Sequence, residues 1–432
     1  MNYIKSTIKN GINLHLLNTN KFKTNLFSVF ITTPLDRSTI TKNALIAAVL
    51  RRGTQNMQSQ DEISKNLENM YGASFDCGVE KTGDNHVIKF YLECINDSFL
   101  PNSESILKQC FNILTDIVFN PITRNNHFLQ EYVESEKENL KQIIEGKIDN
   151  KNLYATDRCI EEIYINQPYG LFKYGYTEDL KNINAQNLYE YYINLINKSK
   201  IDIFISGDIS EGSIDNLKNN INLNKLNERN ANYLVCETNV EKKKTNDKIN
   251  LVEEKMQINQ GKLVIGLDTY TKNTDASIIN NPIRKFATSV YNIILGGSAN
   301  SKLFQNVREK ESLAYTASSN YIRVKDLILI KAGIEIDNYN KAVSLIKEQL
   351  EQIKKEEFSD EEVENAKKLI ISTVESIPDS QDSEITYYFS QELASENISI
   401  DEYINNIRKV SKKDVVLIAN EIAINTIYFL RN

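Results

Sequence analysis

The sequence runs twice through the same order of predicted elements, and this internal repeat constrains the fold more than any other feature. Each half contains an alternating apolar run, a helix that ends at glycine, a second helix, a β-like pair, an amphipathic helix and a closing apolar strand. A repeat of this length indicates two copies of one folding unit. The matched segments are 26–31 and 262–268, 44–50 and 286–295, 61–71 and 301–310, 73–92 and 313–336, 106–118 and 343–353, and 201–206 and 426–430.

The mixture of paired strands and runs of helices predicts an α+β fold. We expect two homologous domains, each a mostly antiparallel sheet that helices cover on one face. The domains are predicted at residues 1–210 and 249–432, and the Asn- and Lys-rich stretch 211–248 is the predicted linker. One large irregular domain is the alternative interpretation.

Glycines and capping residues predict where several helices begin and end. Gly53 and the pair Gly296-Gly297 follow helical segments, at positions where a C-cap would need a left-handed residue. Ser359 with Glu362 has the spacing of a capping box, which predicts a helix that begins there.

Composition and charge exclude several classes of function. The chain has 432 residues and a formal net charge of −7, which argues against nucleic acid or an anionic membrane as a partner. No apolar stretch is long enough to span a bilayer, and the N-terminus lacks the pattern of a secretory signal. Five scattered cysteines without a C-x-x-C pair indicate a reducing cytoplasm.

The repeat order, the pair Gly53-Thr54 and the run from Gly296 to Ser319 resemble the pitrilysin/insulinase family of zinc metallopeptidases, also called inverzincins. Members carry H-x-x-E-H on the first helix of the first domain. Two histidines four residues apart reach one zinc ion from one helix face, and the glutamate polarises the zinc-bound water.

Alanine replaces all three residues of that motif in this chain. Counting back from Gly53-Thr54 places Ala44, Ala47 and Ala48 at the two histidine positions and the glutamate position. Alanine has no donor atom for zinc and cannot accept a proton. The resemblance therefore implies an inactive homologue with no catalytic residue of its own.

The remaining candidate ligands do not rebuild a metal site either. The helix 133–147 resembles the family helix that supplies the last zinc ligand, but that position falls on Gln142 or Ile143, although Glu136, Glu138 and Glu145 lie nearby in sequence. The only histidines are far apart, and no Cys/His spacing suits zinc. We therefore predict no metal and no cofactor. Two of these histidines are expected on strands and the third in a loop, respectively His15, His86 and His127.

The second half keeps the family's substrate-facing features. Arg308 and Tyr315 match an arginine and a tyrosine that contact bound peptide in the family. An arginine offers forked donors to peptide carbonyls, and a tyrosine adds one hydroxyl. The alternative is a solvated helix residue and a packing residue on a strand. The strand 73–79 matches a family strand that lies at a sheet edge and pairs with substrate.

The resemblance implies the non-catalytic subunit of a heterodimeric, cytoplasmic zinc metallopeptidase. A zinc-bearing homologue would be the partner, and this chain would contribute chamber wall and binding residues for unfolded peptides. Among bacterial relatives, it is most similar to the inactive member of the pair associated with elongation factor P modification. The alternatives are a stand-alone or homodimeric peptide-binding protein and, in a structural role, an assembly subunit like the core proteins of respiratory complexes.

Overall fold

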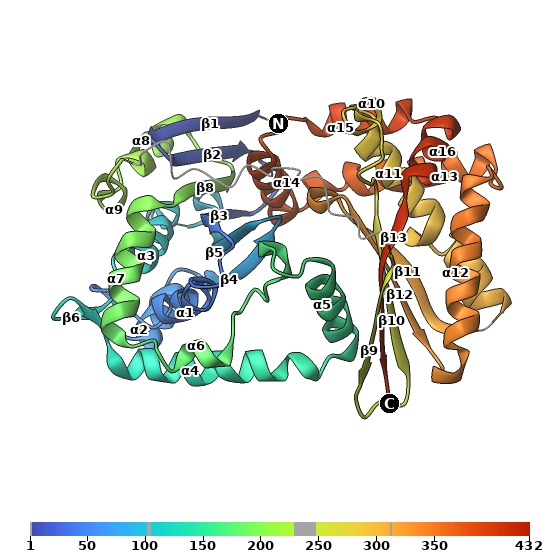
Figure 1. The fold of residues 1–432 in the computed structure, drawn as a ribbon. Helices are drawn as coiled ribbons and strands as arrows, with labels where there is room; N and C mark the ends of the chain where they lie inside the picture. The colour runs from blue at the N-terminus through green and yellow to red at the C-terminus, as the bar shows by residue number, and fades with distance from the viewer. Residues whose placement is uncertain (1, 102–104, 229–247, 312) are drawn as a thin grey trace. The chain divides into compact units, whose positions relative to one another are not determined.

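The computed structural model describes residues 2–101, 105–228, 248–311 and 313–432. The chain is a mixed α+β structure that divides into two compact units (Figure 1), and the predicted fold class is confirmed. Unit 1 consists of Met1–Gly146, Leu171–Glu237 and Pro378–Ser395. Unit 2 consists of Lys147–Gly170, Thr238–Ile377 and Glu396–Asn432.

Unit 1 is built on a six-stranded sheet with the order β1-β2-β8-β3-β5-β4. All neighbouring strands are antiparallel except β2 and β8, which are parallel. The central strands are almost continuously buried, as strands covered on both faces are. The strands are β1 (Asn2–Lys9), β2 (Ile12–Asn18), β3 (Thr24–Pro34), β4 (Ser74–Thr82), β5 (Asn85–Ile95) and β8 (Lys200–Gly207).

Most helices of unit 1 cover one face of this sheet, with the main core of the unit between them. Amphipathic α3 packs directly on β5. The helices are α1 (Ile40–Leu50), α2 (Gln60–Asn69), α3 (Ile106–Phe119), α4 (Gln130–Glu145), α6 (Thr177–Leu180), α7 (Ala185–Lys198), α8 (Glu211–Lys218) and α9 (Ile221–Asn224). The last two lie in the predicted linker, and residues 229–247 of that linker lie outside the described residues.

Unit 2 has a five-stranded sheet with the order β11-β12-β10-β13-β9, in which only β13 and β9 are parallel. Its strands are β9 (Asn250–Lys255), β10 (Gly261–Asp268), β11 (Ala314–Ile322), β12 (Leu327–Ile334) and β13 (Ala423–Arg431). Its helices are α5 (Lys151–Ile163), α10 (Ala276–Ile279), α11 (Arg284–Asn292), α12 (Tyr339–Lys354), α13 (Asp360–Glu375), α15 (Ile400–Lys409) and α16 (Lys412–Glu421).

The two sheets confirm the internal repeat. The order β2-β8-β3-β5-β4 in unit 1 corresponds, strand by strand, to β9-β13-β10-β12-β11 in unit 2. The relative strand directions agree as well, because the parallel pair occupies the same place in the strand order of each sheet. Strand β1 is the addition in unit 1. The first strands of the matched hairpins, β4 and β11, therefore both lie at a sheet edge.

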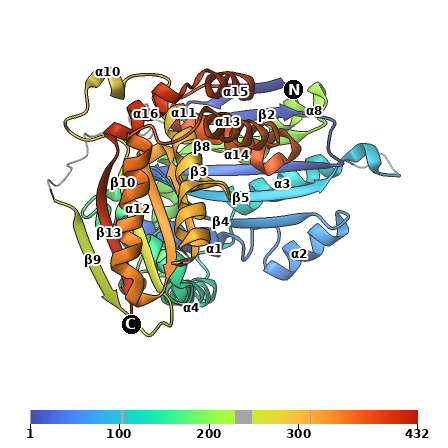
Figure 2. The same ribbon diagram turned by 90° about the vertical axis from the view of Figure 1, so that its right-hand side faces the viewer.

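Each half of the chain also lends one helix to the other unit. Helix α5, which follows α4 in sequence, packs on β10 and β13 of unit 2. Helix α14 (Gln381–Ala394), which follows α13, packs on β3 and β8 of unit 1 (Figure 2). Each lent helix lies on the sheet face opposite the main core, and the two smaller apolar clusters form there. The structure thus adds one helix to the face that was predicted to carry none.

The glycine caps were predicted wrongly. None of Gly53, Gly296 and Gly297 has a positive φ. Gly53 and Gly296 instead need glycine because other backbone approaches them closely, whereas a Cβ on Gly297 would first meet the side chain of Ile293. A Cβ on Gly53 would lie 2.9 Å from the carbonyl oxygen of Gln58, and one on Gly296 would lie 2.6 Å from the backbone nitrogen of Ser319.

Other local predictions had mixed outcomes. The segment predicted as helix 301–310 is a π-helix, η6 (Leu303–Lys310), and a second π-helix, η5 (Ile293–Gly297), continues α11. π-helical turns are rare and are often found at functional sites. The capping box at Ser359 is confirmed. His127 was wrongly expected in a loop, because it pairs in a two-stranded ribbon of β6 (Thr123–Arg124) with β7 (His127–Phe128).

Candidate functional site

Helix α1 of unit 1 carries the three alanines that replace the metal-binding motif. Ala44 and Ala47 are buried, and Ala48 is half-buried. Neighbouring groups already occupy their surroundings, since α1 packs against α4 and against β4. The Cys77 thiol on β4 donates a hydrogen bond to the carbonyl oxygen of Ala47, with 3.2 Å between sulfur and oxygen. The face that would hold zinc in an active relative is a packed surface in this chain.

The Cys77 thiol that contacts this helix face stays protonated near pH 7. Burial raises the pKa of Cys77 to about 12, and the positive charge of Arg51 opposes that rise only in part. Metal ligation and nucleophilic attack both need the thiolate. Cys77 therefore acts as a small packing residue with a weak hydrogen bond, and sequence spacing gave no signal of its place beside α1.

Helix α4 carries no carboxylate at either of the two predicted ligand positions. Gln142 and Ile143, the two candidates for the last ligand position, are exposed. Glu136 is 6% exposed and accepts a hydrogen bond from the guanidinium of Arg52, with which it forms an ion pair. An arginine two residues after the end of α1 thus neutralises the buried carboxylate of α4. Glu136, Gln142 and Ile143 therefore do not fit a zinc ion.

Strand β4 leaves one edge of the unit 1 sheet open. Among the described residues it pairs only with β5, and most of its side chains are exposed or half-buried. The segment 73–79 predicted as an edge strand therefore lies at an edge. Unpaired N–H and C=O groups along such an edge can hydrogen-bond an extended peptide without any particular side chain.

The structure places Arg308 and Tyr315 on adjoining elements of unit 2. Arg308 lies on η6 and Tyr315 on β11, and η6 packs against β11. Arg308 is exposed, and its guanidinium carbon lies 4.5 Å from the ring centroid of Phe304. Tyr315 is 61% exposed, and its hydroxyl donates to Glu335 Oε1 at 3.3 Å. Both polar groups face solvent, and the contacts they make are local ones.

His86 belongs to a buried network beside α1. Its Nδ1 lies 3.1 Å from Asn43 Nδ2, and its Nε2 lies 2.9 Å from the carbonyl oxygen of Lys173. The Asn43 amide can only donate to Nδ1, which assigns the proton to Nε2. Tyr191 completes the network by donating to Asn43 Oδ1 at 2.8 Å. Burial lowers the pKa of His86 to about 4, so the ring is neutral near pH 7.

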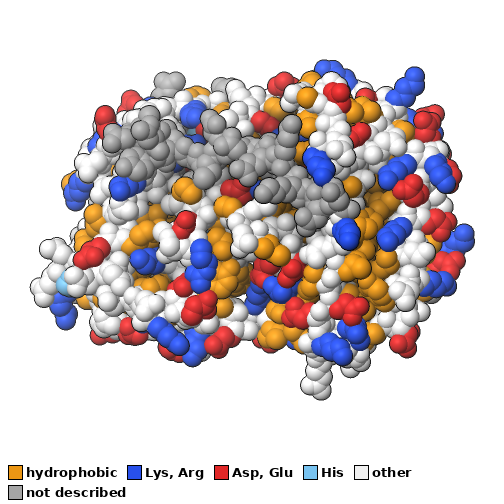
Figure 3. All heavy atoms as spheres, in the orientation of Figure 1, with side chains coloured by type: hydrophobic (Ala, Val, Ile, Leu, Met, Phe, Trp, Pro, Cys, Tyr) orange, Lys and Arg blue, Asp and Glu red, His pale blue; other side chains and the backbone are white. Residues whose placement is uncertain are grey.

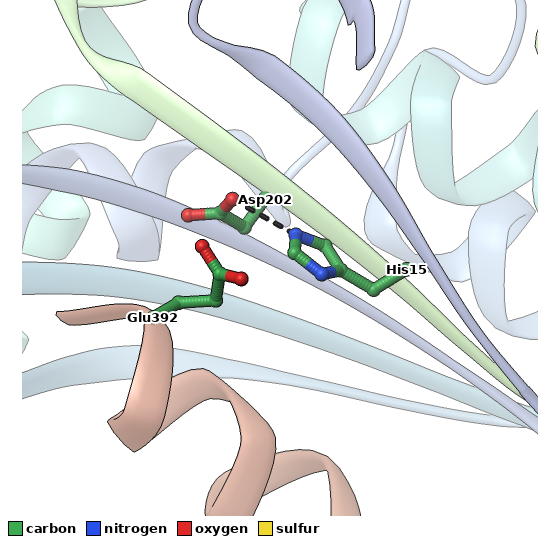
Figure 4. Close-up of side chains that lie close together, drawn as sticks. All are labelled: His15, Asp202 and Glu392. Atoms are coloured by element: carbon green, nitrogen blue, oxygen red, sulfur yellow. Dashed lines mark hydrogen bonds and ion pairs between the residues drawn. The ribbon is translucent and has the colours of Figure 1, made fainter. Parts of the chain in front are cut away.

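His15 lies in the one group within the described residues where three possible metal ligands come within 4.8 Å of one another. The group joins His15 of β2, Asp202 of β8 and Glu392 of α14 (Figure 4). His15 Nε2 lies 3.0 Å from Asp202 Oδ1. Lys5 and Lys200 approach the two carboxylates at 2.6 Å and 3.2 Å.

This second cluster fits an ion-pair network better than a metal site. Burial alone would raise the pKa of Asp202, but the hydrogen bond from His15 and the charge of Lys200 lower it. Two lysines already balance the two carboxylates, so a cation would have to displace them. The network instead holds the end of α14 against the sheet, and Tyr3 extends it by a 2.8 Å hydrogen bond to His15 Nδ1.

Acidic and basic side chains are interspersed on the face shown in Figure 3. No helix in the described part of the chain is long and apolar enough to cross a membrane.

Comparisons with known proteins agree with this architecture. The model of the peptidase M16 inactive domain matches residues 182–370. The probable inactive metalloprotease YmfF of Bacillus subtilis is 33% identical over 421 residues, which cover 98% of this chain and 96% of that protein. The non-peptidase homologue YmxG of Helicobacter pylori is 20% identical over 300 residues, covering 68% of this chain and 66% of that protein.

A solved structure has the same fold throughout. The crystal structure of a conserved protein from Enterococcus faecalis V583 matches with a TM-score of 0.86 and 28% identity, covering 100% of this chain and 99% of that one. The predicted resemblance is thereby confirmed over nearly the full length. The chain belongs to the peptidase M16 family, the pitrilysin/insulinase type of metallopeptidase, as an inactive member without catalytic activity of its own.

Proposed function

We propose that this chain is the non-catalytic, peptide-binding subunit of a heterodimeric cytoplasmic metallopeptidase whose zinc-bearing partner is a homologue. One contrast carries the proposal. The face of α1 is packed with alanines and an Arg52–Glu136 ion pair, whereas Arg308 and Tyr315 keep exposed polar groups. An inactive chain that acted alone would have no catalytic use for the second set.

The open edge of β4 supports a role in binding unfolded peptides. Main-chain pairing along an edge strand gives affinity with little dependence on sequence. Arg308 would add a forked donor to carbonyl groups of the same class of ligand, and Tyr315 a single hydroxyl. The partner would supply zinc and hydrolysis, and this chain would contribute wall and anchoring surface to a shared chamber.

A pull-down of the tagged chain from its native cytosol tests the proposal. We expect a homologue of similar size that carries H-x-x-E-H, together with zinc and peptidase activity. Arg308→Ala should lower activity at subsaturating peptide without releasing zinc, whereas Lys310→Ala, an exposed cation on the same π-helix, should change little. Recovery of the chain alone, without zinc or activity, would refute the subunit role and favour a stand-alone or homodimeric peptide-binding protein.

A further inference from the structure

Unit 1 contains a pocket that the inactive zinc site does not explain. It has a volume of about 650 Å³ and lies among α2, α3, α9 and the loop that follows α1. Six of its thirteen lining residues are asparagines, although Asn makes up only 54 of the 432 residues of the chain. The lining is therefore enriched in carboxamides well beyond the composition of the chain. Pockets of this size suit small ligands or a short stretch of peptide.

Asp116, on α3, is the single acidic residue in the lining, and it is only 6% exposed. Asn56 Nδ2 donates to both of its carboxylate oxygens at 3.1 Å, and Asn120 Nδ2 donates to Oδ1 at 2.7 Å. No described residue forms an ion pair with Asp116. A carboxylate this deeply buried normally has a cationic partner. Two asparagines thus hold the negative charge of Asp116 in place, but no described residue supplies a positive charge to balance it.

The hydrogen bonds of Asp116 indicate which kind of cation fits. A carboxylate has about four acceptor positions, and the two asparagines fill two on Oδ1 and one on Oδ2. One position remains, on Oδ2. A guanidinium needs two acceptors side by side, whereas a compact ammonium needs one carboxylate oxygen and further single acceptors. Carboxamide oxygens of the lining can serve as those further acceptors.

We infer that this pocket binds the ammonium group of a lysine side chain from an extended peptide. The inference rests on the proposed peptide-binding function and names a specificity for it. Met70 of the pocket lies four residues before Ser74, where β4 begins. Four residues span at most roughly 14 Å. A peptide paired with the start of the β4 edge therefore brings its side chains within reach of the pocket.

Substituting Lys225 changes the net charge of the pocket in the direction opposite to a substitution of Asp116. It lines the pocket, is exposed, and forms no ion pair with a described residue. Its positive charge competes with a ligand ammonium for the field of Asp116. Removing that charge strengthens the binding of a cationic ligand, whereas removing the charge of Asp116 weakens it.

Calorimetric titration of the full chain with two peptides tests the inference. The probes are acetyl-Gly-Ser-Lys-Ser-Gly-amide and the same peptide with glutamine in place of lysine. We expect the lysine peptide to bind about tenfold more tightly, a preference that D116N abolishes and K225M increases. Asp61→Asn, an exposed acid on α2, is the matched control and should leave the preference unchanged.

Each outcome of these titrations either supports or overturns the inferred lysine site. Equal binding of the two peptides, or no binding of either, overturns the inference, as does a folded D116N protein that keeps the preference. If D116N does not fold, an unchanged or weaker preference in K225M overturns it instead. These titrations use the chain without a partner. A failure here therefore leaves the subunit proposal intact, and a failed pull-down leaves the lysine preference measurable.

Discussion

Glu384 of the lent helix α14 is a buried acid through which pH should affect the stability of unit 1. Its side chain is fully buried, and neither carboxylate oxygen has a hydrogen-bond partner among the described residues. Its helix neighbour Ile385 packs into the apolar cluster that joins α14 to the sheet. Burial raises the pKa of Glu384 to about 7, and the charge of Lys21 opposes the rise only in part.

The direction of the pH effect follows from this raised pKa. Below the unfolded value of about 4.5 the carboxyl is protonated in both states, so its titration leaves the stability unchanged. Between pH 4.5 and 7 the unfolded chain releases the proton while the folded chain retains it, and stability falls as pH rises. A difference of about 2.5 pKa units corresponds to at most about 3.4 kcal/mol above pH 7, and relaxation around the charge reduces that to roughly 2–3 kcal/mol.

Glu384→Gln keeps the shape of the protonated acid and removes its titration. We expect the variant to match the wild type near pH 4.5 and to exceed its free energy of unfolding by about 2–3 kcal/mol at pH 8. Urea unfolding between pH 4.5 and 8, followed by circular dichroism because the chain has no tryptophan, measures the difference. Asp382→Asn, an exposed acid on the same helix, should show no such gain. A variant that is no more stable than the wild type at pH 8 would refute the reasoning.

Three further predictions concern single contacts. Arg284→Ala should cost about 3–5 kcal/mol in urea unfolding, because it leaves the buried carboxylate of Asp326 without the two 2.9 Å hydrogen bonds of the guanidinium. His86→Gln should remove the destabilising contribution that this one ring makes as pH falls from about 6.5 to 4, since burial lowers the pKa of His86 to about 4; a pH profile of stability identical to that of the wild type contradicts this. Gly296→Ala should destabilise by about 1–3 kcal/mol, because its Cβ would meet backbone at 2.6 Å; Gly78→Ala, with open space, should lower the melting temperature far less.

The sequence was most informative where a pattern repeats along the chain. Period-2 runs at 26–31 and 262–268 predicted β3 and β10, and both became central strands of corresponding sheets. The loss of the metal site also followed from sequence alone, because alanine at positions 44, 47 and 48 has no ligand atom whatever the fold. Neither conclusion needed knowledge of contacts between distant segments.

Other features depend on contacts that no local pattern encodes. Nothing in the sequences of the lent helices α5 and α14 indicates which sheet they cover. The pocket around Asp116 collects side chains from residues 56–120 and 220–225, each unremarkable in its own segment. Gly53 and Gly296 were read as helix caps because glycine after a helix is common there. The actual reason, close approach of another backbone, is visible only in three dimensions.

The face of α1 that would hold zinc is closely packed in this chain, unlike an active site that has only lost its metal ligands. Ala44 and Ala47 are almost fully buried, so a histidine or glutamate there would force overpacking and bury unpaired polar atoms. The one buried carboxylate nearby, on Glu136, is already neutralised by Arg52. Restoring zinc would require undoing that ion pair as well as three substitutions. The fold of unit 1 is therefore stabilised by the residues that exclude zinc-dependent catalysis, as expected of an inactive member of the family.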